Sequence, residues 1–133
     1  KRVFELNPEA KLWFCGTMNT SVYGGVYELN EDLKSRFRML PLDYPEKGDE
    51  IQIVHTVLEQ YNKDELLKIL TLAHETRQKS LAYALSPRDT VQIMEDIEYC
   101  GLENALRLAS GKFEGQDRAY FLSRVTSIFG VTL

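Results

Sequence analysis

The sequence predicts the edge of an α/β domain in residues 1–45, with two strands and one helix, followed by an all-α bundle over residues 46–133. Two observations lead to this mostly helical fold class. The continuous apolar run at residues 12–17 is typical of a strand that is buried on both faces of a parallel sheet. After Pro45 the apolar residues change to helical spacing, which predicts helices for the rest of the chain.

The first region contains the residues that we expect to form a sheet edge. Residues 18–27 are rich in Asn, Ser and Gly and should form a loop at the C-terminal end of the first strand. Asn30 can cap a short helix that runs through Phe37. Residues 38–44 resemble a second strand, at a sheet edge or with a bulge because Pro41 cannot donate to a ladder. Two strands cannot cover both faces of a sheet, so we expect further strands upstream, in a longer protein.

Four of the expected helices in the second region follow from apolar residues three or four positions apart. The first two contain Ile51, Val54 and Leu58, and Leu66, Leu70, Ala73 and Leu81. The last two contain Leu102, Leu106 and Ala109, and Phe121, Val125, Ile128 and Phe129, with a stop at Gly130. No strand is expected after residue 45.

The remaining helix, third in the bundle, has the clearest start signal in the chain. The hydroxyl of Ser86 can cap it, Pro87 suits the first helical position and Asp89 lies in the first turn. The helix should run to about Cys100 and end at Gly101.

The composition excludes several classes of protein. Hydrophobic residues make up 44% of the chain, and no apolar run approaches the roughly 20 residues of a membrane span, which indicates a soluble protein. The net charge of −4 makes a nucleic-acid partner unlikely. Cys15 and Cys100 lie far apart with no CxxC spacing, and His55 and His74 lack partners at metal spacing. We therefore expect no disulfide scaffold, no metal site and a cytoplasmic location.

Four short motifs follow one another in an order that resembles a known family. They are Gly16-Thr17-Met18-Asn19, Gly25-Val26-Tyr27-Glu28-Leu29, Leu33-Lys34-Ser35-Arg36-Phe37 and Ser86-Pro87-Arg88. The same order is found in the MoxR-like and dynein-related branch of the AAA+ ATPases. This branch includes the McrB-like GTPases, midasin, the gas-vesicle ATPase and the small cobaltochelatase subunit. The stretch from Arg118 to Gly130 looks most like the cobaltochelatase type.

The resemblance implies that residues 1–45 are the C-terminal edge of a P-loop AAA+ core and that residues 46–133 are its helical lid. It implies a full-length ATPase that uses ATP and Mg²⁺, assembles as a hexameric ring and remodels or activates a protein partner. In relatives that partner often carries a metal-dependent adhesion-type domain. The chain itself has no GxxxxGK[ST] phosphate loop and no acidic pair after an apolar strand to hold magnesium. We therefore expect the chain alone to be inactive and to bind no cofactor.

Asn19 resembles the sensor 1 residue of this family, which helps to hold the attacking water near the γ-phosphate. This role needs a neutral donor and acceptor at the tip of a strand, and a carboxamide provides both. The alternative is a loop asparagine that satisfies its own turn. We predict Asn19 to be a catalytic residue.

Arg36 resembles the arginine finger, which in a ring reaches the γ-phosphate bound by the neighbouring subunit. A guanidinium is always charged and can bind phosphate oxygens at two points. The alternative is a surface ion pair with Asp32, one turn earlier, and Arg38 is a nearby rival for the finger role. We assign the catalytic role to Arg36 because it directly precedes Phe37 at the end of the helix.

Arg88 resembles sensor 2, a lid arginine that contacts a phosphate of the nucleotide. Its place in the first turn of a helix sets a cation beside unpaired N–H groups, which favours an anion. The alternative is an ordinary solvated first-turn residue. We predict that Arg88 binds the nucleotide.

Two other functions remain open at this point. One is a non-enzymatic helical module that recruits a protein through an exposed groove. The other is a McrB-like GTPase or a nucleic-acid-associated motor, which the acidic charge balance disfavours.

Overall fold

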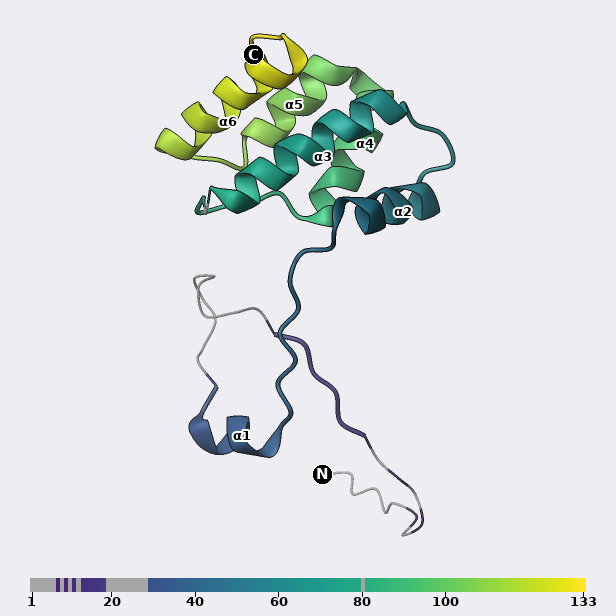
Figure 1. Cartoon of the computed structure of the whole chain (residues 1–133), viewed down its shortest axis with the longest axis vertical. Coiled ribbons are helices and arrows are strands. Elements are labelled where there is room, and N and C mark those ends of the chain that lie inside the picture. The colour runs from purple at the N-terminus through teal and green to yellow at the C-terminus, as the bar shows by residue number, and fades with distance from the viewer. Residues whose placement is uncertain (1–6, 8, 10, 12, 19–28, 80) are drawn as a thin grey trace, which may run out of the picture. The chain divides into compact units, whose positions relative to one another are not determined.

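The computed structural model describes residues 7, 9, 11, 13–18, 29–79 and 81–133. The chain divides into two compact units, Lys1–Pro41 and Leu42–Leu133, and each is described here by itself. The described residues are mostly helical, as predicted, and their helices are labelled α1 to α6 in Figure 1.

The described part of the first unit contains one short helix, α1, at Glu31–Arg36. Asn30 caps it as predicted, because its side-chain oxygen accepts a hydrogen bond from the backbone N–H of Asp32 at 2.7 Å. The helix buries none of its residues. It therefore gains little from packing within this unit.

The predicted α/β edge is not seen. Residues 13–17, within the first expected strand, and residues 38–44, the second, are irregular, and no strand occurs in the described parts of the chain. The physical reason is that a strand needs a neighbour to accept and donate its ladder hydrogen bonds. An apolar run supplies the side chains for a buried strand, but the described residues offer no strand to pair with it.

The second unit is a helical bundle, in agreement with the prediction for the region after residue 45. Its helices are α2 at Lys47–Val57, α3 at Lys63–Gln78, α4 at Pro87–Cys100, α5 at Leu102–Ser110 and α6 at Gly115–Phe129. Gly101 and Gly130 end α4 and α6 with φ values of 83° and 74°, which favour glycine. Leu81 was expected in the second helix of the bundle, but α3 ends at Gln78, and Leu81 packs on the core from the following loop.

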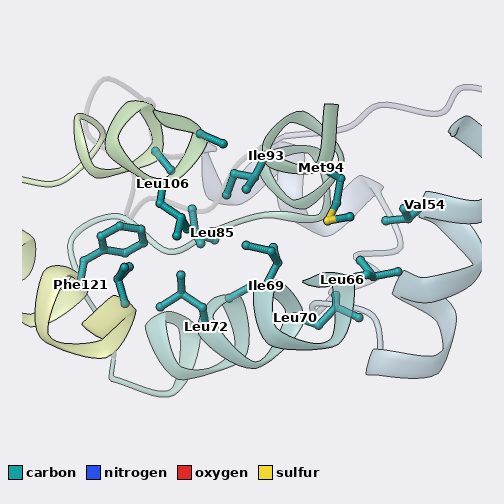
Figure 2. Packing of buried hydrophobic residues seen from close by; sticks show 14 of the residues in the cluster. Val54, Leu66, Ile69, Leu70, Leu72, Leu85, Ile93, Met94, Leu106 and Phe121 are labelled. Atoms are coloured by element: carbon teal, nitrogen blue, oxygen red, sulfur yellow. The ribbon is translucent and has the colours of Figure 1, made fainter. Parts of the chain in front are cut away.

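Helix α3 contributes the largest share of the core and packs against α2, α4 and α6. Figure 2 shows Ile69 and Leu72 of α3 facing Leu85 and Ile93 across the bundle. The ring of Phe121 stacks on the ring of Phe113, and the two ring centroids lie 4.5 Å apart. Phe113 carries no label in Figure 2. Among the helices that the structure describes, none is long and apolar enough to cross a membrane.

Candidate functional site

The structure describes two of the three predicted site residues. Asn19 lies outside the described residues. Arg36 lies in the first unit and Arg88 in the second, so the surroundings of each are given separately.

Arg36 is the last residue of α1 and is exposed to solvent. Its Nη2 atom lies 3.2 Å from Oδ2 of Asp32, so the ion pair considered from the sequence is present. Both side chains are about 70% exposed, at 70% and 69%. An exposed pair of this spacing stabilises a helix by only about 0.3–0.5 kcal/mol, so it leaves Arg36 free to exchange partners. Arg38 is also exposed and has no ion-pair partner among the described residues.

The first turn of α4 begins with a complete capping box. Ser86 Oγ accepts a hydrogen bond from the backbone N–H of Asp89 at 3.3 Å, and the Asp89 carboxylate accepts one from the backbone N–H of Ser86 at 2.7 Å. Pro87 occupies the first helical position, as predicted. Between these fixed residues Arg88 is exposed, and it has no hydrogen-bond or ion-pair partner in the described part of the chain.

Asp89 is buried beside Arg88 and is held from three sides. The hydroxyl of Tyr83 donates to both carboxylate oxygens at 2.8 Å, the Lys112 ammonium donates to Oδ1, and Ser86 contributes its backbone N–H and its hydroxyl. Burial by itself raises the pKa of Asp89, but the hydrogen bonds from Lys112, Ser86 and Tyr83 outweigh burial and lower this pKa to about 2. The carboxylate is thus ionised and already neutralised by Lys112.

Thr90, two residues after Arg88, is hydrogen-bonded to a buried ion pair. Its hydroxyl donates to Glu50 Oε1 at 3.1 Å. The same carboxylate receives both terminal nitrogens of Arg77, at 2.7 and 2.8 Å, and the two side chains are only 2% and 8% exposed. A bidentate pair of this kind fixes orientation as well as charge.

The sequence analysis did not identify Glu50 or Arg77. They lie 27 residues apart in different helices, a separation that carries no pairing signal. A weaker signal was present, because Glu50 precedes Val54 by four positions and Arg77 follows Ala73 by four. Both charges therefore continue an apolar stripe and face the core.

These contacts make the first turn of α4 a rigid element that presents one cation. An exposed guanidinium in the first turn of a helix, at the positive end of the helix dipole, can bind an anion such as phosphate. A surface hollow of about 530 Å³ lies elsewhere in the bundle, and its lining includes Ile51, His55, Tyr61 and Leu66. Neither Arg36 nor Arg88 lines that hollow.

Comparison of the chain with protein-family models, with curated proteins and with solved structures finds no match in any of the three.

Proposed function

We propose that this chain is the C-terminal part of an AAA+ ATPase of the MoxR-like and dynein-related type. In this proposal the protein couples ATP hydrolysis to the remodelling or activation of a protein partner in the cytoplasm. The observation that carries the proposal is that Arg88 is exposed in the first turn of α4, within the motif that resembles sensor 2. The capping box of Ser86 and Asp89 fixes this turn. The four motifs in family order support it further.

In this proposal three residues of the chain take part in nucleotide binding and hydrolysis. Asn19 orients the attacking water within its own subunit, and Arg88 binds a phosphate of the nucleotide. Arg36 acts on the nucleotide of the neighbouring subunit in a hexameric ring, where its charge stabilises the transition state. ATP and Mg²⁺ are bound mainly by a phosphate loop and acidic residues upstream of this chain. In this proposal the protein partner carries a metal-dependent adhesion-type domain, as partners in the resembled family often do.

The experiment compares substitutions in the full-length protein with a matched control. Arg36→Ala should abolish ATP hydrolysis with nucleotide affinity largely retained, because the finger acts mainly as transition-state charge develops. Arg88→Ala should weaken nucleotide binding. The control is Arg107→Ala, an exposed arginine of α5 outside all four motifs, which should change neither quantity.

Mixed rings test the assignment of Arg36 to the neighbouring subunit. Arg36→Ala and Asn19→Ala subunits should each be inactive alone, but an interface that joins an intact finger to an intact sensor should regain hydrolysis. If mixed rings form and stay inactive, Arg36 does not act between subunits. A full-length protein that binds no nucleotide would instead favour the non-enzymatic interaction module.

A further inference from the structure

We propose that Arg77 and Glu50 are positioning residues, which together fix the first turn of α4 and so set the direction in which Arg88 is presented. This inference rests on the nucleotide-binding role proposed for Arg88 and deepens it. Neither residue touches the nucleotide in this proposal. Both act through the backbone and side chains on either side of Arg88.

The segment that leads into α4 is hydrogen-bonded to α3 through both backbone polar groups of Leu85. The backbone N–H of Leu85 donates to Thr76 Oγ1 at 3.0 Å, and the carbonyl of Leu85 accepts from Arg77 Nε at 2.7 Å. Leu85 itself is fully buried, at 0% exposure. Its backbone groups are therefore shielded from water, and Thr76 and Arg77 together hold residue 85 in place.

The residue that follows Asp89 is held by the same ion pair. Arg77 uses its two terminal nitrogens to orient Glu50, and Glu50 accepts the hydroxyl of Thr90, which is 0% exposed. One guanidinium thus reaches both flanks of Arg88, directly at Leu85 and through Glu50 at Thr90. Arg88 is the residue of this turn that remains exposed without a partner in the described ranges.

The same guanidinium also contacts the chain that enters the bundle. The guanidinium carbon of Arg77 lies 4.4 Å from the ring centroid of Tyr44, three residues before α2 begins at Lys47. Glu50 lies in the first turn of α2. In this proposal a shift of the entering segment moves Arg77, and through Arg77 it changes the first turn of α4. The pair connects the entry of the bundle with the direction of Arg88.

The test is a double-mutant cycle in the full-length protein, read out as the affinity for ATPγS with Mg²⁺. Arg77→Lys keeps the charge but loses the planar fork that makes three hydrogen bonds at once. We expect it to weaken binding about fivefold or more when Arg88 is present, and by less than about twofold in the Arg88→Ala background. Equal losses in the two backgrounds would overturn the proposal, because Arg77 would then act independently of Arg88.

Amide hydrogen exchange gives a second readout that needs no nucleotide. Arg77→Lys should speed exchange at the backbone N–H groups of Asp89 and Thr90, and unchanged rates there would overturn the proposal. Thr90→Val, which removes the hydroxyl that bonds Glu50 at 3.1 Å and lies 3.4 Å from the Ser86 carbonyl oxygen, should act in the same direction with a smaller effect. This milder variant keeps the test decisive if Arg77→Lys unfolds the bundle.

The matched control is Arg124→Lys. Arg124 makes an equally bidentate pair with Glu75, at 2.6 and 2.7 Å, but the pair joins α6 to α3 and does not touch the first turn of α4. It should leave ATPγS affinity and the exchange of Asp89 and Thr90 unchanged. If wild type and Arg88→Ala bind ATPγS equally, the role proposed for Arg88 is wrong. The exchange data then still show whether Arg77 orders the turn.

Discussion

The two units differ in how far their described apolar side chains are buried. In Leu42–Leu133 large side chains such as Phe121 and Leu106 are fully buried at 0% exposure, and five helices share one core. In the described part of Lys1–Pro41, Trp13 and Phe14 are 88% and 79% exposed, and α1 buries none of its residues. Because apolar burial is the main driving force of folding, the described residues that contribute most to stability lie in the second unit.

The two units also differ in how they use a carboxylate–arginine pair. Asp32 and Arg36 meet in water, where each can be replaced by solvent at little cost. Glu50 and Arg77 are buried, and loss of either would leave an uncompensated charge. The exposed arginine is thus available to a partner, while the buried one organises its surroundings. The following predictions test this contrast, from the largest expected effect to the smallest.

The first prediction compares a fully buried aromatic residue of the second unit with a largely exposed one of the first unit. Phe121→Ala should lower the free energy of unfolding of the chain by about 3–5 kcal/mol, because it leaves a cavity beside Phe113 in a core that cannot fully collapse. Trp13→Ala should change it by less than about 0.5 kcal/mol. Urea unfolding followed by circular dichroism measures both. A large loss for Trp13→Ala would show that the first unit has a core of its own.

The second prediction concerns the pH dependence conferred by Asp89. Its pKa is about 2 in the folded protein against 3.8 for a free carboxyl, and each pKa unit corresponds to about 1.4 kcal/mol. Because the folded pKa is the lower one, ionised Asp89 contributes about 2 kcal/mol of stability above a pH of about 4. This contribution is lost as the pH falls from about 4 towards 2.

Urea unfolding of wild type and Asp89→Asn from pH 7 to pH 2 provides the measurement. The asparagine variant should be less stable at neutral pH, and the difference should shrink below a pH of about 4. Subtracting the two curves removes the titration of the other carboxylates. A difference that does not change with pH would mean that the bonds from Lys112 and Tyr83 do not depend on the charge of Asp89.

The sequence predicted the helical bundle well because its signals are local. A capping serine followed by proline sets the start of α4, and Gly101 and Gly130 mark helix ends that favour a positive φ. The prediction of two strands was wrong because the signals for a strand are not local. The apolar run at residues 12–17 specifies a surface to be buried, but strand formation depends on a neighbour that no local pattern supplies.

The local surroundings of the described candidate residues were predictable to a similar extent. The exposure of Arg88 and its place on the first turn of α4 follow from the Ser86-Pro87 start, and the Asp32–Arg36 pair follows from a spacing of four. The buried pair of Glu50 and Arg77 was not predicted, since it depends on how α2 and α3 pack. Charges that continue an apolar stripe reveal that a buried partner is needed, without revealing which residue it is.

The last prediction concerns the exposed pair of α1 and has the smallest expected effect. Asp32→Asn removes the charge that faces Arg36, and we expect the free energy of unfolding to change by less than about 0.5 kcal/mol. The reason is that both side chains are mostly solvated before and after the change, so little electrostatic energy is at stake in water. The measurement is urea unfolding at low and at high salt, and the difference between wild type and variant should vanish at high salt because exposed pairs are screened. Arg36→Gln, which removes the other half of the pair, serves as the control and should give an equally small change.

A loss above about 1 kcal/mol for both variants would mean that the pair holds the first unit together. Arg36 would then be a structural residue, and its proposed role as a finger between subunits would lose its main physical support, which is that the side chain is free to leave Asp32.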